Sequence, residues 1–315
     1  MNAQQYVFSF RAMGSEFNVW VETEGDGPTI VRQVPAWVEE IEARLTRFRP
    51  QSELNALNAR SGQWVTVSDV LYRAIEKALH AAALTDGLYN PLILPALVAA
   101  GYTRSFDEIR AGAAVEDSAS EQPVIVPDWR SVALAPKRRA VRLPAGAQID
   151  LGGTAKGWTA ELIANRLAAY GPCLVDAGGD LVARGTPQNQ PGWVVAVAEP
   201  GAADDTPPIL SVALADQAVA TTGIDYRRWR QGGKLQHHII DPRTGQPAQT
   251  DVQSVTVICP TATAAEAYAK AILLLGSEAG LEWVNQQPQH AALVVRTTGA
   301  VVATQDFMSH TVALA

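Results

Sequence analysis

The spacing of hydrophobic and polar positions predicts several amphipathic helices. Valine, isoleucine and leucine recur at steps of three and four residues between Thr29 and Arg47, which predicts a helix that is kinked at Pro35 or begins near it. The same periodicity predicts a helix over Val70 to Thr85, with Ser68 or Asp69 as N-cap and Gly87 in the stop position. Further helices are expected over residues 52–58, 157–170 and 262–275, and residues 92–99 form a short apolar segment.

Short apolar runs between turn residues predict the strands. Two strands are expected within Val7 to Glu22, around a turn at residues 12–15. Strands and long helices follow one another without regular alternation, which favours an α+β fold in a single domain over residues 1–315. The polar, acidic residues 103–124 are expected to form an exposed insertion or a loose helix. The other predicted strands cover residues 129–134 and 140–143 (a pair joined by the basic turn 136–139), 173–175, 181–183, 193–198, 210–214, 218–221, 252–259, and a last hairpin at 294–302.

The amino-acid composition and the charge argue against several classes of protein. The chain has 315 residues, 47% of them hydrophobic, and a net charge of −7, which argues against general nucleic-acid binding. Cys173 and Cys259 lie in apolar runs and are expected to be buried thiols, with no CxxC pattern for a structural zinc site. The first ten residues lack the basic and apolar regions of a secretory signal. No apolar run approaches the roughly 18 residues of a membrane span, so we expect a soluble, cytoplasmic protein.

The segment Ile149 to Trp158 carries the strongest chemical signal. An apolar run delivers Asp150 into the paired glycines Gly152 and Gly153, and Lys156 follows at the start of a predicted helix. Glycines allow backbone N–H groups to approach a phosphate closely, and the lysine adds a cation. The spacing fits neither the Rossmann nor the P-loop pattern. The alternative is a tight turn from strand to helix with a surface lysine.

Three other polar clusters lie where strands end or helices begin. Residues 175–180 form a second paired-glycine turn with two carboxylates, and an ordinary β-turn is the alternative. A histidine pair precedes the turn signals of residues 241–245, where it could act in acid–base chemistry or be structural. Glu266 and Lys270 share one helix face, either as a surface ion pair or as a polar pair aimed into a site.

In their order along the chain, these clusters resemble the motifs of the ApbE family of FAD:protein FMN transferases. The resemblance runs from Met13 to about Gly276 and is most specific at Asp150 to Gly157. It implies a central antiparallel sheet core of the T-fold type with long helices and an added α/β lobe. The similar blocks are Met13–Ser15, Leu45–Asn58, Asp86–Pro91, Asp150–Gly157, Ala177–Asp180, Thr221–Gly223, His238–Gly245 and residues 265–271.

The resemblance also implies an activity. In that family a bound FAD is cleaved at its diphosphate, and FMN is joined through a phosphoester to a threonine of a target protein. A divalent ion, usually magnesium, bridges the diphosphate, and family members are often exported. His238 matches the histidine that would activate the acceptor hydroxyl. The positions that match FAD contacts are Met13, Phe48, Leu88, Tyr89, Asn90, Asp150, Lys156, Ile239 and Ala269.

The metal positions depart from the family pattern. Gly153 is retained where a backbone carbonyl would bind the ion, but Glu266 stands in place of an aspartate and Lys270 in place of a threonine. A charged ammonium group cannot ligate a metal, so Lys270 is expected to act as a substitute cation on the diphosphate. Asn90 also replaces an aspartate, and Phe48 replaces a tyrosine.

Three hypotheses follow from these matches and departures. The first is an active flavin transferase, either magnesium-dependent or using Lys270 instead of an ion. The second is an FAD-binding carrier or regulatory protein that has lost the transferase chemistry. The third is an FAD diphosphatase that releases FMN and AMP because water takes the place of the threonine hydroxyl.

Overall fold

The computed structural model describes residues 3–112, 124–202, 206–287 and 291–312. Contacts between Cα atoms divide the chain into two compact units. The sheet unit comprises Met1–Glu39, Lys156–Tyr226 and Thr250–Ala315, and the helix-rich unit comprises Glu40–Ala155 and Arg227–Gln249. None of the helices in the described ranges is long and apolar enough to cross a membrane.

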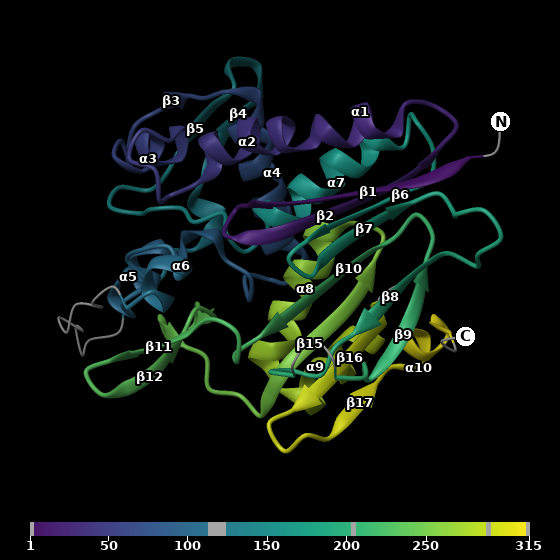
Figure 1. Cartoon of the computed structure of the whole chain (residues 1–315). Coiled ribbons are helices and arrows are strands. Elements are labelled where there is room, and N and C mark those ends of the chain that lie inside the picture. The colour runs from purple at the N-terminus through teal and green to yellow at the C-terminus, as the bar shows by residue number, and fades with distance from the viewer. Residues whose placement is uncertain (1–2, 113–123, 203–205, 288–290, 313–315) are drawn as a thin grey trace. The chain divides into compact units, whose positions relative to one another are not determined.

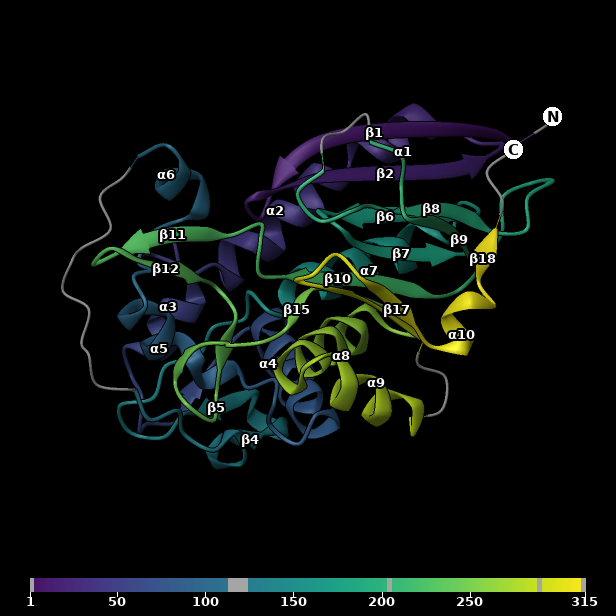
Figure 2. The same cartoon turned by 90° about the horizontal axis from the view of Figure 1, so that it is seen from below.

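The sheet unit is built on an antiparallel sheet of eight strands, in the order β1-β2-β6-β7-β10-β15-β16-β17 (Figures 1 and 2). Each neighbouring pair is antiparallel, and helices separate some of the strands along the chain, so the predicted α+β class is confirmed. The strands are β1 (Gln4–Ala12), β2 (Ser15–Thr23), β6 (Cys173–Ala177), β7 (Asp180–Arg184), β10 (Ala218–Gly223), β15 (Val252–Cys259), β16 (Ala291–Arg296) and β17 (Val301–Ala303).

The first hairpin shows how the sequence sets the faces of this sheet. Phe17, Val19 and Val21 alternate along β2 and are fully buried, whereas the residues between them are less buried. The turn at Met13 and Gly14 has positive φ at both residues (51° and 66°), as in the two-residue turns that suit a twisted hairpin. Met13 is not a glycine, so its left-handed backbone is a local cost that marks a constrained position.

Helices cover one face of the sheet and a smaller sheet covers the other. On one face the hydrophobic side chains of α1 (Gly27–Arg32), α2 (Val34–Leu45) and α7 (Ala155–Leu167) pack against β2 and β6. On the other face lies a three-stranded sheet in the order β18-β9-β8, whose apolar residues pack against β6, β15 and β16. Its strands are β8 (Trp193–Val197), β9 (Leu210–Leu214) and β18 (Thr311–Val312).

The alanine-rich helix α8 (Ala262–Leu275) packs against β10 and β15 and is buried on nearly all sides. A helix that is apolar all round belongs in a protein interior. Thr261 caps its start, and Gly276, with φ of 88°, follows its end as predicted. Helices α9 (Ser277–Asn285) and α10 (Gln305–Met308) complete the unit.

The helix-rich unit combines short helices with small antiparallel sheets. Its longest helix, α4 (Asp69–Leu84), begins at the predicted cap Ser68 and is followed by Asp86 and Gly87, both with positive φ. A hydrophobic cluster around Leu97, Tyr102 and Trp229 forms part of its core. The other elements are α3 (Glu53–Asn58), η1 (Pro91–Ile93), α5 (Leu94–Ala99), α6 (Phe106–Arg110), η2 (Trp129–Ser131), η3 (Pro136–Arg138), the sheet of β3 (Val65–Thr66), β5 (Ala140–Arg142) and β4 (Ala133–Ala135), and the pairs β11 (Arg228–Gln231) with β12 (Lys234–His237) and β13 (Ile240–Asp241) with β14 (Gln246–Pro247).

Some local predictions need correction. The strand expected over residues 129–134 begins only at Ala133, because Asp128 caps a short 3-10 helix at Trp129–Ser131. The periodic stretch 29–47 is two helices, and the second begins at Val34, which confirms the alternative of a helix that begins near Pro35. Within 103–124, Ser105 caps the short helix α6 and most of residues 103–112 are exposed, whereas residues 113–123 lie outside the described part. Cys173 and Cys259 are buried free thiols, as predicted.

Candidate functional site

Four ionisable side chains form a polar centre in the sheet unit, here called the carboxyl–lysine cluster: Lys156, Asp180, Glu266 and Lys270. Lys156 lies in the first turn of α7, where its Nζ pairs with the carboxylate of Asp180 at the start of β7 and donates to the carbonyl oxygen of Ala177 at 3.4 Å. The Lys156 and Asp180 side chains are 15% and 4% exposed. Lys156 is therefore a partly buried, paired cation, and the surface-lysine interpretation is wrong.

Glu266 brings a second carboxyl group to the cluster from α8. It is 2% exposed, so the surface ion pair with Lys270 is the wrong alternative. Burial raises the pKa of Glu266 well above its ordinary range, and the nearby Asp180 raises that pKa further, whereas Lys270 and Lys156 lower it. A side-chain hydrogen bond with Asp180 acts on the pKa of Glu266 in the same direction as burial. The Nζ atom of Lys270 donates to the Glu266 carbonyl oxygen at 3.3 Å.

The cluster does not fit a divalent metal ion. Magnesium and calcium are held by several oxygen ligands, usually ionised carboxylates. Within the described residues, no group of three or more His, Cys, Asp or Glu side chains is placed to hold a metal. In the cluster, two ammonium groups accompany two carboxyl groups, and burial favours the neutral form of Glu266.

Gly157 explains how α7 and α8 approach closely at the cluster. A Cβ atom on Gly157 would lie 2.7 Å from Oε2 of Glu266 and 3.0 Å from Cβ of Ala262. The first distance is shorter than any normal contact, so a side chain here would displace Glu266 or separate the helices. The absence of a side chain at Gly157 therefore makes room for the buried carboxyl group.

We expect Gly157→Ala to lower the free energy of unfolding by about 1–3 kcal/mol, the usual cost of overpacking a close contact. Urea unfolding of the variant measures this cost. Gly25→Ala is the matched control, since a Cβ atom there would meet only Thr23 Oγ1 at 3.5 Å. An unchanged unfolding midpoint for Gly157→Ala would contradict the close approach of the two helices.

The second paired-glycine turn adjoins the cluster. Gly178 and Gly179 have φ of 65° and 93°, and the Gly179 N–H donates to Oδ1 of Asp176 at 2.7 Å. A Cβ atom on Gly178 would lie 2.6 Å from Cβ of Ser15, so the turn beside Met13 packs directly against this one. Burial raises the pKa of Asp176. This turn therefore places Asp180 next to Lys156 and contacts the turn that contains Met13.

In the helix-rich unit, Asp150 forms an ion pair with Arg47. The Nε of Arg47 lies 2.9 Å from Oδ2 of Asp150, and the two side chains are 7% and 11% exposed. The other oxygen, Oδ1, accepts the N–H of Gly152 at 2.8 Å, as expected for a carboxylate that enters a glycine turn. Asn58 fixes the preceding residue by hydrogen bonds to both the N–H and the carbonyl group of Ile149 (2.8 and 3.0 Å).

A group of aromatic rings surrounds the Arg47 guanidinium group. Its central carbon lies 4.2 Å from the ring centroid of Phe48 and 4.6 Å from that of Tyr102. Tyr102 in turn stacks on Trp229, with centroids 5.2 Å apart, and Trp229 Nε1 donates to the Ala100 carbonyl oxygen. Phe48 is 41% exposed. An accessible ring next to a fixed cation and carboxylate can bind a flat, polar-edged ring system.

The other predicted contacts of this unit occupy structural positions. Tyr89 is buried, with its hydroxyl 3.0 Å from Oγ1 of Thr154. Both ends of the Asn90 amide are occupied, because Oδ1 accepts from Leu92 N and Nδ2 donates to the carbonyl oxygen of Pro127. Leu88 is half-buried. The roles of these residues toward a cofactor stay predictions.

The histidine pair divides into one structural and one more accessible ring. His237 is buried, and its two ring nitrogens contact the Ala248 carbonyl oxygen (3.0 Å) and the Ile239 N–H (3.3 Å). His238 is half-buried, and Ile239 after it is buried. Burial lowers the pKa of His237. His238 is therefore the less buried of the two histidines, and its role in acid–base chemistry stays a prediction.

His237 should make stability depend on pH. The folded state favours the neutral ring of His237. The stability that this preference contributes is fully present above the unfolded pKa of about 6.5, and it is lost as the pH falls toward the lower folded pKa. We expect the urea midpoint to fall between pH 7.5 and pH 5 by more in the wild type than in His237→Gln, whose amide can still donate to Ala248. His80→Gln, on the exposed face of α4, is the control and should leave the pH dependence unchanged. Equal pH dependence in wild type and His237→Gln would contradict this role.

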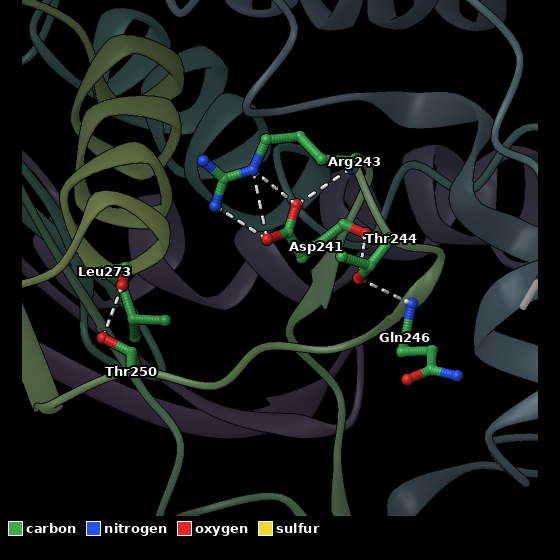
Figure 3. Close-up of polar contacts among 6 residues, drawn as sticks. All are labelled: Asp241, Arg243, Thr244, Gln246, Thr250 and Leu273. Atoms are coloured by element: carbon green, nitrogen blue, oxygen red, sulfur yellow. Dashed lines mark hydrogen bonds and ion pairs between the residues drawn. The ribbon is translucent and has the colours of Figure 1, made fainter.

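The segment after the histidines is the turn that the Asp-Pro and Thr-Gly pairs predict (Figure 3). The Asp241 carboxylate accepts hydrogen bonds from two side-chain nitrogens of Arg243, and the shorter of these joins Nη2 to Oδ2 at 2.7 Å. The main-chain carbonyl oxygen of Asp241 accepts hydrogen bonds from the N–H groups of Thr244 and Gly245. In the sheet unit, Thr250 Oγ1 donates to the Leu273 carbonyl oxygen at 2.8 Å and so ties the start of β15 to α8.

The structure sorts the predicted site residues into two groups. The sheet unit holds Met13, Lys156, Glu266, Ala269 and Lys270, and three of these belong to the carboxyl–lysine cluster. Ala269 is fully buried on α8. The helix-rich unit holds Phe48, Leu88, Tyr89, Asn90, Asp150, Gly153, His238 and Ile239.

Sequence reasoning missed the partners that fix the predicted residues. The sequence places Asp180 only in a turn and predicts no role for Arg47 or Tyr102, although Arg47 lies beside Phe48 in the block Leu45–Asn58. An arginine next to a candidate ring residue is a weak signal for a cation–π contact. No signal in the sequence pairs Arg47 with Asp150.

The fold and the two groups of residues define a protein of mixed antiparallel sheet and helices with a buried lysine–carboxylate centre. A family model described as "ApbE family" matches residues 13–294, and the chain belongs to that family.

Known proteins of this family resemble the chain over most of its length. A relative from Treponema pallidum (strain Nichols), named FAD:protein FMN transferase, is 34% identical over 285 residues, covering 84% of this chain and 76% of the relative. A protein of the same name from Vibrio cholerae is 25% identical and covers 94% and 89%. The crystal structure of the ApbE protein from Thermotoga maritima has a TM-score of 0.82 at 27% identity, covering 98% and 100%.

Proposed function

We propose that the chain is an FAD:protein FMN transferase. The observation that carries this proposal is the buried lysine–carboxylate centre beside the paired-glycine turn of Gly178 and Gly179, inside a family match of residues 13–294. The names of the relatives from Treponema pallidum and Vibrio cholerae support the same activity. That residues 1–315 act as a single transferase domain stays a prediction. The cytoplasmic location of the protein stays a prediction as well.

The proposed reaction exchanges one phosphorus–oxygen bond for another. The threonine Oγ of a target protein forms a bond to the FMN phosphorus of FAD, and the bond from that phosphorus to the bridging oxygen breaks. AMP leaves with the electron pair of that bond, and the hydroxyl proton passes to His238. Phosphoryl transfer depends mainly on positioning and on positive charge near the phosphate oxygens. We assign that charge to Lys156 and Lys270.

We further propose that the reaction proceeds without a divalent ion. The donor set of the cluster does not fit magnesium, as described above, and Lys270 stands where the family pattern implies a ligand. An ammonium group is a compact point charge that can neutralise phosphate oxygens. In the helix-rich unit, Asp150 and Phe48 are assigned to the polar edge and the face of a flavin ring.

The activity is tested by incubating the protein with FAD, with and without magnesium, and following FMN and AMP by chromatography. A threonine-containing acceptor protein is then added, together with its Thr→Val variant as control. If the chain is the transferase, the amount of AMP released equals the amount of FMN attached covalently to the acceptor. The mass increase of FMN is then found on the threonine form of the acceptor and not on its Thr→Val variant. Release of free FMN and AMP with no labelled acceptor would indicate the diphosphatase instead, and tight FAD binding without turnover would indicate the carrier; either result contradicts the transferase.

A further inference from the structure

Arg47 carries a buried donor group that no contact within the protein explains. Its side chain is 7% exposed, and its Nε lies 2.9 Å from Oδ2 of Asp150. Among the residues that the structure describes, Nη2 of Arg47 is buried and has no hydrogen-bond partner. A buried donor without an acceptor costs free energy, and a charged donor costs more than a neutral one. Because such groups are rare in folded proteins, this one points to an acceptor from outside the chain.

The two rings that flank the Arg47 guanidinium group differ in how firmly they are held. Tyr102 is buried, its ring centroid lies 4.6 Å from the guanidinium carbon, and it stacks on the buried Trp229. Phe48 lies 4.2 Å from the same carbon but is 41% exposed. An exposed ring can turn about its side-chain torsions without disturbing a packed core. Phe48 is therefore the ring that can give way to a ligand beside the guanidinium group.

Arg47 and Asp150 together match one edge of a flavin ring. The guanidinium group is a hydrogen-bond donor only, and a carboxylate is an acceptor only. In the described part of the chain, Oδ2 of Asp150 pairs with Arg47 and Oδ1 accepts from the Gly152 N–H, so each oxygen keeps a lone pair for a further donor. The pyrimidine edge of a flavin presents two carbonyl acceptors with an N–H donor between them. A donor and an acceptor held side by side complement one carbonyl and the N–H of that edge.

We propose that Arg47 is a further FAD-binding residue, whose Nη2 donates to a carbonyl oxygen on the pyrimidine edge of the flavin ring. This assignment rests on the proposed function, because it concerns the same FAD. Phe48 turns aside from Arg47 as the flavin enters and lies against the face of the ring. The guanidinium charge then lies beside the part of the flavin that carries negative charge after a nucleophile adds to the ring, and it favours such forms of the bound flavin.

Sulfite is a probe of this charge. It adds to N5 of an oxidised flavin: the sulfur lone pair forms the S–N5 bond, and negative charge passes to the pyrimidine ring. Sulfite is titrated into the protein saturated with FAD, in EDTA and without an acceptor protein, and the loss of visible flavin absorbance reports the adduct. We expect sulfite to bind FAD on the wild-type protein at least about tenfold more tightly than it binds free FAD, a difference of about 1.4 kcal/mol.

Variants of Arg47 separate its charge from its packing. Arg47→Met keeps an unbranched side chain but removes the donor and the charge. It should therefore raise the Kd of FAD, and the Kd of sulfite for bound FAD, at least about tenfold each. Arg47→Lys keeps the cation and should restore most of the sulfite affinity. Arg73→Met is the matched control, since it removes a 63% exposed arginine of the same unit and should change neither constant.

Three results would overturn the role of Arg47. The first is equal sulfite affinity of bound and free FAD in the wild type, and this comparison holds even if Arg47→Met fails to fold, because it needs no variant. The second is an Arg47→Met protein that binds FAD and sulfite as the wild type does. The third is a lower FAD affinity of Arg47→Met with unchanged sulfite affinity, which would show that Arg47 only supports the structure around Asp150.

Flavin transfer is measured separately, by mass spectrometry of an acceptor protein after incubation with FAD. If the wild type transfers FMN but one of these three results is found, only the role of Arg47 is contradicted. If Arg47 changes the sulfite affinity of bound FAD as expected but no transfer occurs, only the proposed function is contradicted.

Discussion

Replacing Lys156 by methionine should reduce the rate of FMN transfer by about 100-fold or more and lower the free energy of unfolding by about 3 kcal/mol. The first effect follows because removing one fixed charge from a transition-state site typically costs 10²–10³ in rate. The second follows because Asp180, 4% exposed, would lose its ion-pair partner and remain as a buried charge. Single-turnover kinetics and urea unfolding measure the two effects.

A double-mutant cycle separates the ion pair from the loss of the side chain itself. Lys156→Met together with Asp180→Asn removes both charges, so its stability loss should be smaller than the sum of the two single losses. Lys77→Met, on the exposed side of α4, should change stability by less than about 0.5 kcal/mol. Strictly additive losses in the cycle would show that Lys156 and Asp180 do not interact.

The double variant Glu266→Asp with Lys270→Thr should turn the enzyme into a magnesium-dependent one. The shorter carboxylate and the hydroxyl group replace a buried carboxyl group of raised pKa and a cation by oxygen ligands of the kind that magnesium prefers. We expect the ratio of transfer rates with and without magnesium to rise at least about tenfold over the wild type, since a bound ion supplies several kcal/mol of charge stabilisation.

Lys270→Arg is the control for this experiment because it keeps a positive charge at the same position. Its transfer rate should not depend on magnesium. If the double variant responds to magnesium no differently from the wild type, the assignment of α8 to the phosphate groups is wrong. Both variants should be checked for FAD binding, so that a lost cofactor is not mistaken for a lost reaction.

The parts of the fold that local sequence determines were predicted well. The helix α4 was placed within one residue at each end, because Ser68 caps it and Gly87 allows the left-handed backbone after it. The first hairpin was predicted from alternation and a glycine turn. The error at residues 129–134 has a local cause too: Asp128 caps a short 3-10 helix within an apolar run that resembles a strand.

The site depends on contacts that no local pattern encodes. Lys156 meets Asp180 because β6 and β7 form a hairpin beside α7, and Asn58 holds Ile149 across 91 positions of the chain. Periodicity predicts which face of a strand is buried but not which strands become neighbours. The burial of Glu266 is signalled only in part, because α8 consists mostly of alanine and large apolar side chains, but Thr263 and Lys270 share the face of Glu266.

The central claim is that ammonium groups of the protein take the place of a divalent ion in the proposed transfer. The most direct measurement is the rate of covalent FMN incorporation into an acceptor threonine by the wild-type protein in excess EDTA, compared with the rate in magnesium. The account predicts the same rate in both conditions. Loss of incorporation in EDTA, with recovery when magnesium is restored, would contradict it.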